Sequence, residues 1–139
     1  MRLRSKNLSS QAARDQSIYL RFVVGGDGEH HKLLTGLVAE ARLLRDKGEL
    51  AAYEDEQLES IYTWLNSHLP CPPFSTAGWS RDAVSWFKHT AKESIERMRS
   101  LAVVLEAHGK QVRVLRSTNP GKILYEDPFQ VVVEEWKRL

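Results

Sequence analysis

The sequence predicts a single α/β domain, on the borderline with α+β, whose mixed sheet has five strands in the order β-α-α-β-α-β-β-β. Three patterns lead to this prediction. A long amphipathic helix pattern at residues 90–108 lies between two short runs of alternating apolar residues, which is typical of a strand, a helix and a strand. Two further helix patterns adjoin each other at residues 29–47 and 52–67. Two strand-like runs follow near the end of the chain, at residues 122–126 and 129–134.

The first 16 residues are predicted to be a disordered basic tail, and residues 17–139 a single globular domain. The tail contains no aromatic or β-branched residue and is rich in Ser, Gln and Arg, a composition typical of disorder. Residues 1–21 hold five basic residues and one acidic residue, although the whole chain has a net charge of only +2. Such an arm can bind nucleic acid or anionic lipid. We favour the simpler interpretation of a solvated chain end.

A strand is predicted at residues 17–24, because apolar side chains occur there on both faces, which indicates burial on both sides. The glycine-rich residues 25–28 end this strand. They match neither the dinucleotide-binding pattern nor the P-loop pattern for binding phosphate. The carboxylates of Asp27 and Glu29 would also repel a phosphate group. We therefore interpret the segment as a turn between the strand and the following helix.

The next two helices are predicted to form an αα-hairpin. The first begins near residues 29–31 and ends at Lys47 and Gly48, because a basic last turn and a glycine cap are typical of a helix end. The second helix covers residues 52–67 and has acidic residues in its first turn, where they favour a helix N-terminus. Three prolines within residues 70–73 end it, since proline cannot continue a helix.

The clearest element is the helix at residues 90–108. Thr90 and Glu93 stand three residues apart just before its apolar stripe, which predicts a capping box. Gly109 is predicted to end the helix in a left-handed conformation, with His108 in the last turn. The stripe that we expect to face the sheet consists of Ile95, Met98, Ala102 and Leu105, widened by Leu101 and Val104.

The strands on either side of this helix are predicted to be parallel. Val84 and Trp86 alternate with other residues before the helix, and Val112 and Val114 do so after it. A strand, a helix and a strand of these lengths normally form a right-handed crossover between parallel strands. A turn with Pro and Gly at residues 117–121 then leads into the last two strands, which are predicted to form an antiparallel meander.

Two segments of the chain resemble a group of small bacterial proteins to which no activity is assigned. The first segment is Ser85-Trp86-Phe87-Lys88, which is followed by a His-Gly pair at a helix end. The second runs from Pro120-Gly121 through Glu126-Asp127 to Gln130-Val131-Val132. The resemblance covers roughly residues 19–133 and implies one compact domain. It implies no chemistry.

Composition and single residues argue against several classes of protein. An apolar content of 42% is typical of a soluble globular protein, and a single cysteine, Cys71, excludes an internal disulfide and a cysteine-rich metal site. No apolar run is long enough to span a membrane, and no hydrophobic signal region follows Met1, so a cytoplasmic protein is predicted. His30 and His31 lack metal-ligand spacing, because adjacent helical residues point about 100° apart. No cofactor, metal or catalytic residue is predicted.

Strand direction predicts one candidate ligand site. If the first strand and the two strands beside the long helix are parallel, their carboxyl ends share one edge of the sheet, where open α/β sheets bind ligands and helix N-termini attract anions. Glu126 and Asp127 are expected in a turn on the opposite edge. The alternative is that Thr90 only caps its helix and Lys88 is only solvated. The residues predicted to bind a small anion are Lys88, His89, Thr90, His30 and His31.

The favoured function is that of a non-enzymatic binding or accessory protein acting through protein-protein contacts, because no catalytic constellation is found in the sequence. Val131, Val132 and Val133 make the last strand apolar on both faces, so it is either covered by the fold or available for pairing, for example in a homodimer. One alternative is a small-anion or nucleotide binder, or an enzyme, at the Lys88 edge. Another is a nucleic-acid binder that uses the basic tail. No membrane partner is predicted.

Overall fold

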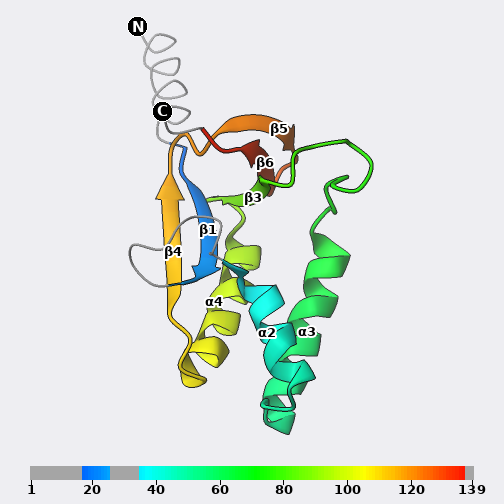
Figure 1. The fold of residues 1–139 in the computed structure, drawn as a ribbon, viewed down its shortest axis with the longest axis vertical. Helices are drawn as coiled ribbons and strands as arrows, with labels where there is room; N and C mark the ends of the chain where they lie inside the picture. Colours follow the sequence, from blue (N-terminus) through cyan, green and yellow to red (C-terminus); the bar gives the residue numbers. More distant parts are fainter. Residues whose placement is uncertain (1–16, 26–34, 137–139) are drawn as a thin grey trace, which may run out of the picture.

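The computed structural model describes residues 17–25 and 35–136. The helices are α2 (Leu37–Asp46), α3 (Ala52–His68) and α4 (Lys92–Ala107). The strands are β1 (Tyr19–Val24), β2 (Thr35–Gly36), β3 (Ala83–Lys88), β4 (Val112–Ser117), β5 (Lys122–Glu126) and β6 (Gln130–Glu134). Strands β1 and β4 lie side by side along the molecule, β3, β6 and β5 lie across one end, and the helices lie beside them (Figure 1). No helix of the described residues is long and apolar enough to cross a membrane.

All pairings among the described strands are antiparallel. The strand order is β4-β1-β3-β6-β5, with the short β2 beside the end of β1. Strands β3 and β4 therefore run in the same direction, but β1 lies between them and is antiparallel to both. The predicted order of elements is confirmed apart from β2, whereas the predicted parallel pairing in a mixed sheet is wrong, and the fold is α+β. A strand-helix-strand pattern fixes the direction of the two strands but not whether a third strand enters between them.

Strand β1 changes its partner along its length. Tyr19 and Leu20 pair with β3, whereas Val23 and Val24 pair with β2. On its other side, β1 pairs with β4 over the whole of Tyr19–Val24. Because β1 and β3 stay together for only two residue pairs, the sheet divides there, and β3, β6 and β5 take a different direction from β1 and β4 (Figure 1).

The main core lies between the helices and one face of the sheet. Leu20 and Phe22 of β1 are buried there, together with apolar residues of all three helices. The six residues predicted to form the stripe of α4 are all buried, which confirms that prediction. A smaller cluster contains Trp86 of β3 with Val131 and Val133 of β6. Because neighbouring residues of a strand point to opposite faces, Trp86 lies on the face opposite to Phe87, which packs against the main core.

The two ends of α4 differ in how well the sequence predicted them. The helix begins at Lys92 with Ala91 as its cap residue, and no side chain caps it, so the predicted capping box is wrong. The carbonyl of Thr90 instead accepts a hydrogen bond from the N–H of Lys92 in the turn before the helix. At the other end Gly109 has a φ of 78° and its N–H bonds the carbonyl of Glu106, which confirms the predicted left-handed cap.

The helices α2 and α3 form the predicted hairpin. The predicted start of α2 at residues 29–31 lies outside the described residues, and the helix begins only at Leu37, because Thr35 and Gly36 pair with the end of β1 as β2. Helix α3 begins at Ala52 as predicted. Ala51 has no side-chain acceptor, but its own N–H donates to the carboxylate of Glu54 at 2.9 Å.

The last strand, β6, lies inside the sheet. It pairs with β3 on one side and with β5 on the other, and Val131, Val132 and Val133 are fully buried. Of the two predicted alternatives, the strand is therefore covered by the fold. The chain also approaches β6 closely at Gly121. Any other residue at this position would place its Cβ atom 2.3 Å from the carbonyl oxygen of Glu134, so only glycine fits without a shift of the backbone.

Candidate functional site

The carboxyl ends of β3, β4 and β5 lie at the same edge of the sheet. Lys88 at the end of β3 and Ser117 at the end of β4 both pair with Tyr19 of β1. Strand β1 runs the other way, and Gly25 after its end donates a hydrogen bond to Gln111, which precedes β4. The predicted crevice between Gly25 and Lys88 is therefore absent from the described residues, because antiparallel strands place these two positions at opposite edges. His30 and His31 lie outside the described residues.

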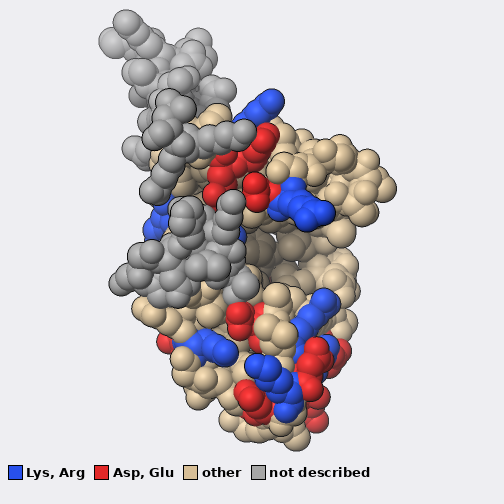
Figure 2. Space-filling model, in the orientation of Figure 1, with Lys and Arg blue, Asp and Glu red and all other residues tan. Residues whose placement is uncertain are grey.

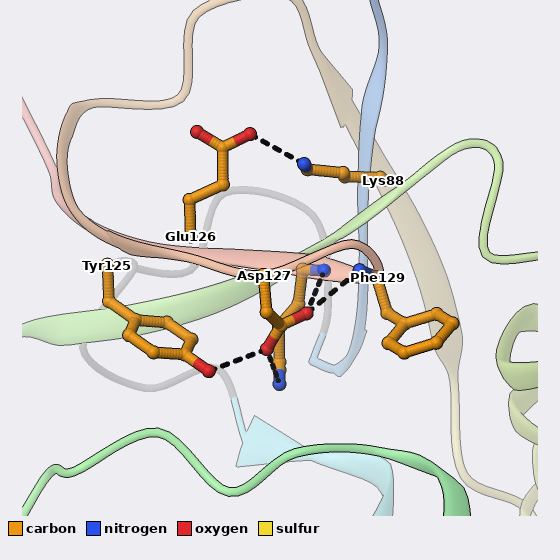
Figure 3. A network of polar contacts seen from close by, with 6 residues as sticks. Lys88, Tyr125, Glu126, Asp127 and Phe129 are labelled. Atoms are coloured by element: carbon orange, nitrogen blue, oxygen red, sulfur yellow. Dashed lines mark hydrogen bonds and ion pairs between the residues drawn. The ribbon is translucent and has the colours of Figure 1, made fainter.

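Lys88 forms an ion pair with Glu126, with 2.5 Å between Lys88 Nζ and Glu126 Oε2 (Figure 3). The sequence placed the carboxylates at residues 126 and 127 on the opposite edge, and this prediction is wrong. Strand β5 is antiparallel to β6, which is antiparallel to β3, so β3 and β5 run in the same direction. The charge of Lys88 is thus partly neutralised, which weakens the case for Lys88 as an anion-binding residue.

Asp127 is a structural residue of the turn between β5 and β6, as the sequence predicted for this turn. Its Oδ1 accepts the N–H groups of Phe129 and Gln130, and its Oδ2 accepts the hydroxyl of Tyr125 and the side-chain amide of Gln130 (Figure 3). Burial alone would raise the pKa of the Asp127 carboxyl, but these hydrogen bonds bring that pKa below its ordinary value. The same carboxylate raises the pKa of Tyr125.

The three predicted site residues that the structure describes do not converge on one point. Lys88 reaches Glu126, as described above. His89 is held at the start of β1: its N–H donates to the carbonyl of Ile18 at 3.0 Å, and its ring Nδ1 lies 3.3 Å from the same oxygen. Thr90 lines a cleft together with Trp64 and other residues of α3 and α4. The predicted anion site of Lys88, His89 and Thr90 is therefore not formed as a single cluster.

No group of three or more His, Cys, Asp or Glu residues in the described part of the chain is placed to hold a metal ion. Cys71 is exposed in the loop after α3.

On the face shown in Figure 2, basic and acidic side chains of the described residues lie interspersed, without a large area of one sign. That face gives no support to nucleic-acid binding by the described body of the protein. The basic residues 1–16 lie outside the described residues.

A cavity of about 270 Å³ opens near the place where β1 separates from β3, and its described lining is mostly apolar. Arg21 is the one charged side chain in that lining. Its guanidinium already bonds the carboxylate of Glu135 at 3.2 Å, so the described lining offers a ligand no uncompensated charge.

The free edge of β4 is the most regular unpaired feature of the described sheet. Gly25 donates to the carbonyl of Gln111, and hydrogen-bonded pairs alternate along an antiparallel ladder. The residues that bond β1 are therefore Arg113, Leu115 and Ser117. The residues whose N–H and C=O groups point away from β1 are Val112, Val114 and Arg116. Among the described strands, none pairs with this side of β4.

Sequence reasoning missed this edge, although one signal pointed to it. Arg113 and Arg116 lie within a strand of six residues, and basic residues are typical of edge strands. The other outer strand, β5, has a register irregularity between Ile123 and Tyr125. Such irregularities protect an edge from pairing, whereas β4 pairs with β1 without interruption.

Comparison of the chain with models of protein families, with curated proteins and with solved structures gave no match. The resemblance of residues 85–88 and 120–132 to small bacterial proteins stays a prediction.

Proposed function

We propose that this protein is a non-enzymatic binding protein that acts through contacts with another protein, and that the free edge of β4 supplies the contact. The observation that supports the proposal is the outward row of backbone donors and acceptors at Val112, Val114 and Arg116. An extended segment of a partner can add to such an edge as a further strand, because its own backbone groups complete the ladder.

The charge of β4 favours an acidic partner segment. Arg116 is exposed on this strand, which has no Asp or Glu. A second copy of β4 would add the same positive charge and no negative charge to complement it. The homodimer that the sequence left possible through the last strand meets a different obstacle, because β6 is already paired on both sides. We therefore propose an acidic, extended segment of another protein as the partner.

The test uses a short peptide of alternating Glu and Val, with a Lys and Val peptide as its charge control. We expect the acidic peptide to slow amide hydrogen exchange at Val112, Val114 and Arg116, and the basic peptide to have no such effect. Arg116→Pro removes one outward N–H without removing a bond to β1, and proline is tolerated on edge strands. Arg116→Ala is the matched control, because it keeps the N–H.

The expected result is that Arg116→Pro binds the acidic peptide at least about tenfold more weakly than Arg116→Ala. Equal binding by the two variants would show that the β4 edge is not the contact. Equal protection by the acidic and the basic peptide would remove the charge argument. If the free protein elutes as a dimer with these same amides protected, β4 pairs with a second copy and the acidic partner is rejected.

A further inference from the structure

The cavity of about 270 Å³ beside the point where β1 separates from β3 is formed by segments far apart in the chain. Its described lining comes from β1, β3, α4, the junction of β2 with α2, and the loop between α3 and β3. No residue of β4 belongs to that lining, so the cavity is a different place from the proposed contact edge.

Phe22, in the β1 wall of the cavity, has a backbone carbonyl to which the described strands give no partner. Hydrogen bonds alternate along an antiparallel ladder, and the N–H of Gly25 bonds a residue beside β4. The backbone groups of Phe22, three residues before Gly25, therefore point to the opposite side of β1. On that side β3 pairs only as far as Leu20 and β2 only from Val23 onwards, so neither strand pairs with Phe22.

Ser85, in the β3 wall, is the residue that would oppose Phe22 if β1 and β3 stayed together. The N–H of Lys88 bonds the carbonyl of Phe129 beside β6, so the N–H of Ser85, three residues earlier, points towards β1 instead. The pairing of β1 with β3 ends before it reaches Ser85. The hydroxyl of Ser85 already donates to Oε1 of Gln130 at 3.4 Å, so the N–H is the group left for a ligand.

The rest of the wall is mostly apolar. Phe22, Leu37 and Met98 are buried, and the rings of Phe22 and Phe87 meet edge to face with 6.4 Å between their centroids. Phe74 also lines the cavity and is 45% exposed, so it marks a place where the cavity reaches the surface. Apolar walls with a few directed polar groups are typical of small-molecule sites.

The one charged side chain of the described lining is already neutralised. The guanidinium of Arg21 bonds the carboxylate of Glu135, and the two side chains are only 14% and 29% exposed. A carboxylate or phosphate that entered the cavity would lose its hydration without gaining a free positive charge, which costs free energy. The cavity therefore favours an uncharged ligand.

We propose that this cavity binds a small uncharged molecule that carries an apolar ring and an amide group. The amide oxygen of the ligand accepts the N–H of Ser85, and its N–H donates to the carbonyl of Phe22, in place of the ladder bonds that end there. The ring lies against Phe74 and Phe87. An apolar cavity of about 150 Å³ binds benzene. A cavity of about 270 Å³ therefore has room for such a ring together with an amide group.

Titration of the ¹⁵N-labelled protein, followed by NMR, tests this proposal with benzamide, benzoate and acetamide. Benzoate has nearly the shape of benzamide but carries a negative charge, and acetamide keeps the amide without the ring. We expect benzamide to shift the amide signal of Ser85 saturably and to bind at least about tenfold more tightly than either control. Benzamide should also slow hydrogen exchange at the N–H of Ser85.

A variant with a smaller cavity locates the site. Val38 is half-buried in the wall, so Val38→Phe should fill part of the cavity and weaken benzamide binding at least about tenfold. Val103→Phe makes the same change at a 68% exposed position of α4, outside the described lining, and should leave binding unchanged. Circular dichroism checks that both variants are folded.

Three results would overturn the proposal. The first is the absence of saturable benzamide binding to the wild type at millimolar concentration. The second is benzoate binding as tight as that of benzamide, because the cavity would then not select an uncharged ligand. The third is wild-type affinity in folded Val38→Phe, because the site would then lie elsewhere. The first two results need no variant.

Discussion

The side chains of Glu54 and His108 join the beginning of α3 to the end of α4, with 2.9 Å between Glu54 Oε1 and His108 Nε2. The side chain of Glu54 is only 7% exposed, and its carboxylate also accepts the N–H of Ala51. One buried carboxylate thus caps α3 and binds the residue that ends α4. This contact joins the beginning of one helix of the main core to the end of another.

Glu54 makes the stability of the protein depend on pH in the acid range. The hydrogen bonds from Ala51 and then His108 hold the pKa of Glu54 below its ordinary value of 4.5. The folded state therefore favours the carboxylate, so this contribution is fully present above pH 4.5 and is lost as the pH falls through the lowered pKa.

We expect Glu54→Gln to lower the melting temperature at pH 7, and to lose less stability than wild type when the pH is lowered to about 3. Glu56→Gln is the matched control, because Glu56 is exposed on the same helix. Thermal unfolding followed by circular dichroism at both pH values is the measurement. A wild-type melting temperature for Glu54→Gln at pH 7 would show that the contact does not stabilise the fold.

The buried stripe of α4 gives a second prediction. Leu105 is fully buried, whereas Val103 on the same helix is 68% exposed. Leu105→Ala should reduce the free energy of unfolding by about 2–5 kcal/mol, because it leaves a cavity in the core. Val103→Ala should change it by less than about 0.5 kcal/mol. A denaturant titration measures both values, and similar losses in the two variants would show that Leu105 does not lie in the core.

Features that depend on neighbouring residues could be predicted from the sequence. The spacing of Ile95, Met98 and Leu105 sets the buried face of α4 within one helix, and Gly109 ends that helix by a local backbone conformation. The predicted bounds of β5 also agree with the structure. In each of these cases the deciding interactions lie within a few residues along the chain.

Features that depend on strand order could not be predicted in this way. Lys88 and Glu126 are 38 residues apart in the chain, and they meet only because β6 lies between β3 and β5. The insertion of β1 between β3 and β4 likewise leaves no local pattern. The failure of the capping box at Thr90 has a different cause, since the turn that precedes α4 uses the carbonyl of Thr90 and delays the helix to Lys92.

The adjacent carboxylates of Glu126 and Asp127 give the last prediction, because their surroundings differ sharply. Glu126 is 51% exposed at its side chain and makes one ion pair with Lys88, whereas Asp127 accepts four hydrogen bonds within its turn. Glu126→Ala should cost no more than about 1 kcal/mol of unfolding free energy, as is usual for an exposed ion pair. Asp127→Ala should cost about 1–3 kcal/mol, because the buried Gln130 and the turn N–H groups lose their acceptor. Urea titrations of the two variants at neutral pH measure these values. A larger loss in Glu126→Ala than in Asp127→Ala would mean that the Lys88 ion pair contributes more to stability than the turn at Asp127 does.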